Sequence, residues 1–529
     1  MGLTPKMASR SLFAAFRQIS GLTAISRVLG FIRDVVFAHY LGAGAATDAF
    51  LVAFKLPNLF RRLTAEGALT NAFLPSYSLA RQQKSDKAAL ILAAEVQTAL
   101  FLGLCFIVLV MEVFMPFVVA GLAPGFMDTP DRLSAAVDLA RLTMPYLPMI
   151  SLVALWAAVL NSHDSFFGGA VAPVILNVCL IGGALCVPFF QAHLQLSAAH
   201  LGVPVAVAVL LAGTAQMFLL QHQLQRARLP MPLFRLGLSS EARRMWGSFV
   251  PAALGAGMMQ INLLVDLVLA SFLATGSISW LYYADRLAQL PLGLVGIALG
   301  TALLPRLSRL QAKSGSELQT QAAFCTELAT AIKPAAILTL PAVAALLILP
   351  EVLIIGLFRS GAFQLSDAQA AAMALMAYAL GLPAFVGLKL TQSALYAMDK
   401  GRFVLLTSSV SVALNICLSL ILMQIYQHVG LALATSLVSW LAFIWQMVWL
   451  IRARRLDGSS LIVVLKAVFA SGIMAAGLYV VLPGLHSLLA SDMLIMLICV
   501  GAGMCVYSLT AHLLGLTAAL FGRAQRQRT

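Results

Sequence analysis

Long apolar stretches separated by short polar loops run along almost the whole sequence. A helix needs about 20 apolar residues to cross a hydrocarbon core about 30 Å thick, and these stretches are long enough. Within lipid the backbone must satisfy its own hydrogen bonds, so such stretches form helices. We predict an all-α polytopic membrane protein with about fourteen transmembrane helices, near residues 20–41, 48–79, 90–121, 136–160, 167–190, 200–222, 246–274, 279–304, 323–357, 368–397, 403–426, 429–451, 461–483 and 491–518.

The composition excludes several other classes of protein. Hydrophobic residues make up 61% of the chain and charged residues 10%, which excludes a soluble enzyme and a disordered tail. The seven cysteines show no CxxC or Cys/His spacing and are expected to be buried apolar residues. HExxH, GxSxG and P-loop spacings are absent from the sequence, and the eight histidines are scattered, so we do not expect an enzyme.

The positions of the charges explain most of the basic character of the chain. There are 34 Lys and Arg residues against 20 Asp and Glu, a formal net charge of +14. About two thirds of the basic residues fall in the loops of one side, whereas the opposite loops hold little beyond Arg132 and Arg359. By the positive-inside rule both termini are expected to be cytoplasmic and the number of helices even. Nucleic acid is therefore not needed to explain the charge.

An internal repeat predicts how the helices are grouped. The segment FAHYLGAGAAT, from Phe37, matches LASFLATGSIS, from Leu269. The offset between these segments aligns the first predicted helix with the seventh. Because six helices separate equivalent points, the two halves should have the same orientation in the membrane. We predict an N-terminal lobe of helices 1–6 in residues 1–225, a C-terminal lobe of helices 7–12 in residues 226–455, and helices 13 and 14 outside the repeat in residues 456–529. Further pairs at similar offsets are Leu74-Pro75 with Leu304-Pro305, Tyr146 with Tyr378, and Asn177 with Asn415.

Several charges lie inside predicted helices, where topology does not explain them. An Arg near the bilayer centre costs at least about 2.5 kcal/mol, so it needs a partner, a wet cavity or both. In the first helix, residues seven apart share a face, which groups Ser26 with Arg33 and Arg27 with Asp34. Gly30 between them lets the backbone bend or another helix approach.

The second helix carries further charges on both sides of Pro57, which is expected to kink it. Asp48 and Lys55 share a face before the proline. After it come Asn58, Arg61 and Arg62, with Glu66 one turn beyond Arg62. In the second half, Asp266 and the pair Asp285-Arg286 also lie in apolar stretches.

These charges have two interpretations. One is that they form internal ion pairs or reach the interface from the helix ends. The other is a central cationic cavity for an anionic guest, because Arg keeps its charge when desolvated and its planar donors suit phosphate. A two-lobed fold with such a cavity would carry a phosphate-bearing molecule by opening alternately to each side.

Specific segments resemble a known family. Four segments are similar to signature segments of the MurJ (MviN) family of lipid II flippases. They are SRVLGFIRD, GAGAATDAFLVAFKLPNLFRRLTAEGA, AFLPSYS and GSISWLYYADRLAQLPLGLVGIALGTALLPRLS. That family belongs to the multidrug/oligosaccharidyl-lipid/polysaccharide exporter superfamily. The resemblance implies a protein of the bacterial inner membrane that moves lipid II from the cytoplasmic to the periplasmic leaflet. It also implies a groove for the lipid tail on helices 13 and 14, contact with membrane lipids, and candidate partners in cell-wall synthesis and division.

The resemblance also implies site residues. The arginines that would bind the pyrophosphate fall on Arg27, Arg33, Arg61 and Arg286, and Arg62 is an adjacent basic position. The polar positions of the family fall on Ser26, Asp48, Asn58, Glu66, Ser279 and Asp285. Some relatives bind sodium, for which Asp266, Asp399 and Asn415 are the candidate ligands here, although Leu395 stands where a polar ligand is expected. No other cofactor is expected, and the membrane potential is the expected driving force.

Two alternative functions remain at this point. A flippase for another polyprenyl-pyrophosphate-linked glycan would need the same cationic cavity, so only the motifs favour lipid II. A cation-coupled multidrug exporter of the same superfamily should have an acidic or aromatic cavity, which the predicted arginines disfavour.

Overall fold

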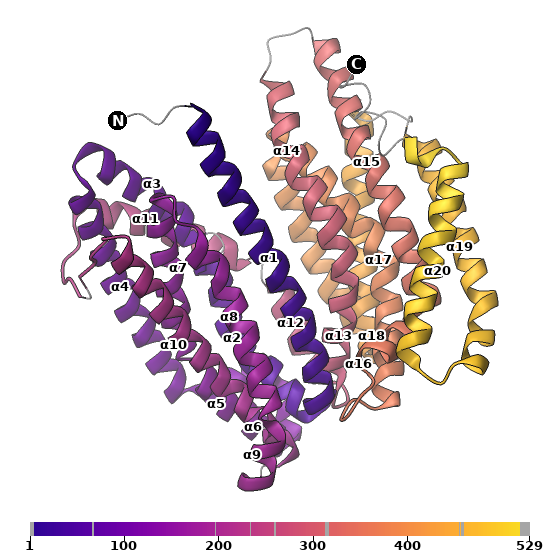
Figure 1. Ribbon diagram of the computed structural model, residues 1–529, viewed down its shortest axis with the longest axis horizontal. Helices are drawn as coiled ribbons and strands as arrows, with labels where there is room; N and C mark the ends of the chain where they lie inside the picture. The colour runs from indigo at the N-terminus through magenta and orange to yellow at the C-terminus, as the bar shows by residue number, and fades with distance from the viewer. Residues whose placement is uncertain are drawn as a thin grey trace. The chain divides into compact units, whose positions relative to one another are not determined.

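Helices form nearly all of the described chain (Figure 1). The computed structural model describes residues 5–65, 68–195, 197–232, 234–258, 261–312, 317–453, 455 and 460–518. No strand occurs in these ranges. The predicted all-α fold class is therefore confirmed.

The chain divides into two compact units, Met1–Gly276 with Ser360–Phe363, and Ser277–Arg359 with Gln364–Thr529. The helices of the first unit are α1 Pro5–Leu41, α2 Ala45–Ala65, α3 Ala68–Gln83, α4 Asp86–Val113, α5 Met115–Leu122, η1 Pro124–Asp128, α6 Pro130–Thr143, α7 Tyr146–Ser162, α8 Phe167–Leu185, α9 Val187–Leu194, η2 Ala198–Gly202, α10 Val203–Arg226, α11 Ser240–Met258 and α12 Ile261–Ser271. Those of the second unit are α13 Ser277–Pro291, η3 Leu292–Ile297, α14 Ala298–Gln311, α15 Glu317–Ile348, α16 Pro350–Phe358, α17 Leu365–Ala397, α18 Gly401–Arg452, α19 Leu461–Leu488 and α20 Asp492–Leu513.

The membrane-spanning stretches agree with the prediction. Within the described ranges, 10 helical stretches are long and apolar enough to cross a membrane. One of them, α18, contains two helices, because Gln427 with φ 51° and ψ −132° interrupts the helical backbone. These two helices correspond to the predicted stretches 403–426 and 429–451. Ten stretches are consistent with about fourteen predicted spans, because some predicted spans consist of two shorter helices in the structure. Examples are α2 with α3, and α11 with α12.

The order of elements repeats along the chain. A long helix followed by a short one occurs as α4 and α5, and again as α15 and α16. Two glutamines in equivalent places of the two halves, Gln216 and Gln446, are both buried. The amide oxygen of Gln216 accepts from the Tyr146 hydroxyl at 3.3 Å. That of Gln446 accepts from Thr391 at 2.6 Å, and its amide nitrogen donates to the Thr407 hydroxyl at 2.9 Å. The element order and the burial of the two glutamines are in line with the predicted repeat, whereas their hydrogen-bond partners, Tyr146 and Thr391, are not equivalent residues.

In the element order of the predicted repeat, α11 and α12 correspond to α1. They nevertheless belong to the first unit, where α11 packs against α3. Lys84 Nζ lies 2.6 Å from Glu241 Oε1, and this hydrogen bond lowers the pKa of Glu241 to about 2. The backbone N–H of Ser239 donates to Glu95 Oε2 at 3.0 Å. The contact units therefore do not divide at residue 226, and the lobe boundaries given above stay a prediction about the repeat.

The end of α12 is held tightly against the turn η1. The backbone N–H of Gly125 donates to Ser271 Oγ at 3.1 Å. A Cβ at position 125 would lie 2.2 Å from the Ser271 carbonyl oxygen, closer than real Cβ atoms come to other groups. Only glycine permits this approach.

A buried ion pair joins α2 to α6 and to the turn after α12. Asp48 Oδ2 accepts from Arg132 Nη2 at 2.9 Å and from the Gly276 backbone N–H at 2.7 Å. The side chains of Asp48 and Arg132 are 0% and 7% exposed, and the guanidinium lies 4.1 Å from the centre of the Phe126 ring. A charge buried this deeply is stable only with its partner, so the pair fixes how these elements pack.

In the second unit, α19 and α20 pack against α15 and α16. Leu349, Met474, Ile495 and Cys499 belong to one buried cluster of these helices. The Tyr507 hydroxyl of α20 donates to a backbone carbonyl of α15 at 2.5 Å. The two helices predicted to lie outside the repeat are thus attached to this unit.

A π-helical segment interrupts the span Ser277–Gln311. It is η3, which follows Pro291 of α13 and precedes α14. Proline has no backbone N–H and cannot complete the α-helical ladder, which favours such an interruption. A Cβ at Gly296 in this segment would lie 3.3 Å from Val386 Cα, so η3 packs closely against α17.

The Asp48–Arg132 pair yields a stability prediction. Asp48→Asn leaves the Arg132 charge buried without its counter-ion, and breaking such a pair costs about 3–5 kcal/mol. We expect a clear fall in the thermal unfolding temperature of the purified protein in detergent. The matched control is Asp138→Asn, because Asp138 is half exposed and, within the described ranges, pairs with His200 alone, at 3.3 Å. Equal unfolding temperatures for the two variants would contradict a structural role for the pair.

Candidate functional site

A chain of hydrogen bonds joins polar side chains of α1 to α8. Arg33 Nε and Nη2 donate to Asp34 Oδ1 at 3.0 and 2.7 Å, and Arg33 Nη1 donates to Asn177 Oδ1 at 3.0 Å. Asn177 Nδ2 donates to the backbone oxygen of Ser26 at 3.0 Å. The side chains of Arg33 and Asp34 are 14% and 0% exposed. We call these four residues, Ser26, Arg33, Asp34 and Asn177, the arginine clamp.

Helix geometry accounts for the arginine clamp. Ser26 and Arg33 were predicted to share a face, and both contact Asn177. A Cβ at Gly30 would lie 3.7 Å from Asn177 Nδ2, so the amide lies over this glycine. The prediction that another helix approaches at Gly30 is confirmed. The Asp34 carboxylate, which the spacing grouped with Arg27 on one face, accepts hydrogen bonds from the adjacent Arg33.

A hollow of about 300 Å³ adjoins the arginine clamp. Ser26 and Thr23 of α1 line it on one side, and Asn161 in the last turn of α7 and Phe166 directly before α8 line it on the other. Gly169 and nearby small residues of α8 complete the wall. The polar groups of this hollow are hydroxyls and an amide, which suit a hydrogen-bonding ligand of either charge.

The other site residues predicted in the first unit lie on α1 and α2. Arg27 is exposed on α1. Arg61 Nε donates to Asn58 Oδ1 at 3.1 Å, which brings together two of the predicted residues one turn apart. Asp48 is fully buried and binds Arg132, as described above, so in this structure it does not face open space. The side chain of Arg62 and the whole of Glu66 lie outside the described residues.

The remaining predicted residues lie on α13, in the second unit. Arg286 Nη2 donates to the Tyr282 hydroxyl at 2.9 Å, and the guanidinium lies 4.9 Å from the centre of the same ring. Asp285 accepts a hydrogen bond from Gln289, one turn further along. Ser279 is fully buried near the start of the helix. The Tyr282 ring therefore orients Arg286 by two contacts.

The three candidate sodium ligands are divided between the units. Asp266 lies on α12 in the first unit, whereas Asp399 follows α17 and Asn415 lies on α18 in the second. Asn415 is 1% exposed and its Oδ1 has no hydrogen-bond partner in the part of the chain described here. A buried amide oxygen of this kind suits a hard cation. The described residues contain no group of three or more His, Cys, Asp or Glu that could hold a metal, and the sodium site stays a prediction.

Sequence reasoning missed the role of two polar residues. In the sequence, Asn177 was noted only because it matches Asn415 in the repeat. Arg132 was noted only as a basic residue of a predicted loop. The signal for Asn177 was an amide within an otherwise apolar stretch, where a polar side chain needs a partner. For Arg132 no local signal existed, because Asp48 lies 84 residues away.

Comparisons with known proteins agree with this architecture. The model of the lipid II flippase MurJ family matches residues 37–502. A probable lipid II flippase MurJ of Rhizobium meliloti is 37% identical over 474 residues, covering 89% of this chain and 86% of that protein. Among solved structures, a lipid II flippase MurJ in an inward closed conformation is similar with a TM-score of 0.77 at 23% identity, covering 96% of this chain and 99% of the other. An inward-facing MATE family multidrug transporter of the MOP superfamily shares the fold at a TM-score of 0.62 and 14% identity, covering 81% and 94%. Since the family model and the Rhizobium meliloti relative both span most of the sequence, the chain belongs to the MurJ family of lipid II flippases.

Proposed function

We propose that this chain moves lipid II from the cytoplasmic to the periplasmic leaflet by alternating access. The observation that carries the proposal is the family match over residues 37–502. The relatives named above are described as lipid II flippases, and the fold is shared with a transporter described in an inward-facing conformation. A flippase transports its substrate unchanged, so no catalytic residue is required.

In this proposal the pyrophosphate of lipid II is bound by Arg27, Arg33, Arg61 and Arg286. Support comes from the way their side chains are held. Asp34 and Asn177 fix the guanidinium of Arg33 in one orientation, and such pre-organisation reduces the entropy lost on binding. The incoming pyrophosphate would compete with Asp34 for Arg33, so Asp34 holds this one guanidinium in place until the substrate arrives.

The membrane potential supplies a driving force in this scheme. Binding of the pyrophosphate offsets the repulsion among the arginines and favours closure of the lobes around the head group. After release, the empty carrier again bears uncompensated positive charge. Moving one charge through 100 mV is worth about 2.3 kcal/mol, so an inside-negative potential would return the empty carrier to its inward-open state.

We also propose that both termini are cytoplasmic. The basic loops identified in the sequence support this orientation by the positive-inside rule. The two exceptions in the opposite loops are both paired with carboxylates, Arg132 with Asp48 at 2.9 Å and Arg359 with Asp492 at 3.1 Å. Two basic residues do not offset the much larger number in the loops of the other side, so the proposed orientation is unchanged.

The function predicts a defined phenotype for Arg33. When the native protein is depleted in its host, lipid II should accumulate in the cytoplasmic leaflet, measured by an accessibility assay from outside. Wild-type protein should restore outward exposure. Arg33→Ala should not restore it, and Arg33→Lys should restore it only in part, because Lys lacks the planar fork of donors. Full restoration by Arg33→Ala at equal expression would disprove the role of Arg33, and accumulation of another lipid-linked glycan would redirect the substrate assignment.

The arginine clamp predicts that Asn177 is a positioning residue. Asn177→Leu removes the hydrogen bond to Arg33, and a bond to a charged group contributes about 1.5–3 kcal/mol. We expect translocation to fall at least tenfold at low lipid II concentration and to recover partly at high concentration, since the defect lies in binding.

Two controls accompany this variant. Val178→Ala alters the neighbouring residue of α8, which is 53% exposed, and should leave translocation unchanged. Asn177→Gln retains the amide and should restore part of the activity. A uniform loss at all lipid II concentrations, with no recovery by Gln, would show that Asn177 serves only the packing of α1 on α8.

The orientation can be tested by cysteine labelling in a cysteine-free background. Lys87 lies at the start of α4 and Ser491 immediately before α20, and both are exposed. A membrane-impermeant thiol reagent added to intact cells should label Ser491→Cys but not Lys87→Cys. Permeabilised cells should show labelling of both. The reverse pattern in intact cells would invert the proposed topology.

A further inference from the structure

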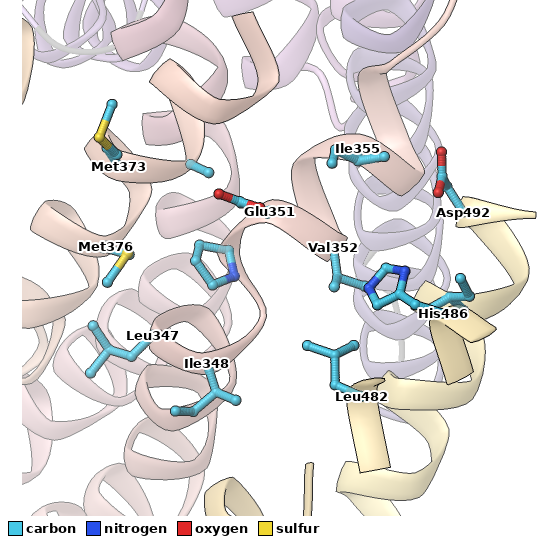
Figure 2. A pocket seen from close by; sticks show the side chains of 13 residues that line it. Leu347, Ile348, Glu351, Val352, Ile355, Met373, Met376, Leu482, His486 and Asp492 are labelled. Carbon is cyan, nitrogen blue, oxygen red and sulfur yellow. The ribbon is translucent and has the colours of Figure 1, made fainter. Parts of the chain in front are cut away.

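A cavity of about 260 Å³ lies in the second unit, between α15, α16 and α17 and the facing ends of α19 and α20. Its wall is mainly apolar and includes Ile348, Met373, Met376 and Leu482. Methionine side chains adapt their shape to irregular apolar guests. Figure 2 shows Met373 and Met376 on one side of the cavity and Val352 on the other. The cavity suits a flexible hydrocarbon chain.

Charged groups stand among these apolar residues. Glu351 lines the cavity from the first turn of α16 and is exposed, and Figure 2 shows its carboxylate between the methionines and His486. Glu351 makes no ion pair or side-chain hydrogen bond within the described ranges of the chain. Asp492 also lines the cavity, but its carboxylate is already bound to Arg359 Nη1 at 3.1 Å. Of the two carboxylates in the cavity wall, Glu351 is therefore the one without an ion-pair partner in the described chain, and His486 is the third ionisable side chain there.

The Asp492–Arg359 pair adds a second recognition element. Arginine has five N–H donors, and Asp492 receives the one from Nη1. The guanidinium side chain is 44% exposed and is fixed next to a residue that lines the cavity. The cavity thus offers a carboxylate and an apolar wall, with an oriented cation beside it at Asp492. A ligand that matches all three carries an ammonium group, a phosphate and an acyl chain.

We propose that this cavity binds a membrane phospholipid whose head group is a primary amine, of the phosphatidylethanolamine class. The ammonium group donates to Glu351, the phosphate lies toward Arg359, and an acyl chain covers the methionines. A primary ammonium has three N–H donors, as in lysine, whereas a trimethylated head group has none. An anionic head group without an amine would be repelled by Glu351.

This cavity is separate from the residues assigned to the pyrophosphate of lipid II, although part of its wall belongs to α19 and α20, on which the lipid-tail groove is expected. None of Arg27, Arg33, Arg61 and Arg286 lines the cavity. The inference therefore does not depend on the proposed function. A test that uses the purified protein and phospholipids alone, without lipid II, gives a result that stands whether or not the chain moves lipid II.

The experiment is a competition among lipids, read by native mass spectrometry of the full-length protein in detergent. Phosphatidylethanolamine, phosphatidylcholine and phosphatidylglycerol with identical acyl chains are added at equal concentrations. We expect the wild-type protein to retain phosphatidylethanolamine most strongly. Glu351→Gln should lower its preference over phosphatidylglycerol about threefold, the size typical of an exposed ion pair. Glu351→Lys should reverse the preference toward phosphatidylglycerol.

The matched control is Glu317→Gln. Glu317 is likewise an exposed acid in the first turn of a helix, α15, but it does not line the cavity. Both substitutions remove the same favourable interaction with a helix N-terminus, so a general loss of stability should affect them alike. Only Glu351→Gln should change the lipid preference. Equal retention of the three lipids by wild-type protein, or an unchanged preference in Glu351→Lys, would overturn the proposal.

Discussion

A guanidinium group inside a membrane protein needs a fixed counter-charge, and the first unit depends on two such arrangements. Asp48 compensates Arg132 and Asp34 compensates Arg33. The Asp48 pair holds together α2, α6 and the turn after α12, whereas the Asp34 pair orients a cation next to a hollow. The same chemistry thus serves packing in one place and substrate binding, as proposed, in the other. The two arginines differ in exposure and in their partners. The side chain of Arg132 is 7% exposed, whereas that of Arg33 is 14% exposed and also donates to Asn177.

Patterns local in the sequence were sufficient to predict much of the fold. Apolar runs identified the helices, and a period of seven residues placed Ser26 and Arg33 on one face. Partners far apart in the sequence could not be predicted in this way. Arg33 and Asn177 are 144 residues apart, and their contact depends on how α1 packs on α8. Hydropathy identifies the polar face of a helix but does not identify the helix that packs against this face.

The repeat keeps its framework and differs in its charges. Gln216 and Gln446 occupy matching positions and are both buried. At the offset that aligns Phe37 with Leu269, Asp34 falls on Asp266, but Arg33 falls on the apolar residue Val265. The second copy therefore retains the carboxylate without the adjacent guanidinium. The predicted sequence repeat thus combines matching polar positions with different charges, an asymmetry that suits a substrate with one charged end.

The π-helical segment η3 has a mechanical consequence. A π-turn uses more residues than an α-turn, so side chains after it are rotated relative to an uninterrupted helix. Arg286, before η3, contacts Tyr282 of its own helix, while Arg306, after it, reaches Glu327 of α15 at 3.1 Å. Arg286 and Arg306, on either side of η3 in this span, thus contact different elements. The segment η3 therefore changes the helical phase between two parts of one span that contact different neighbours.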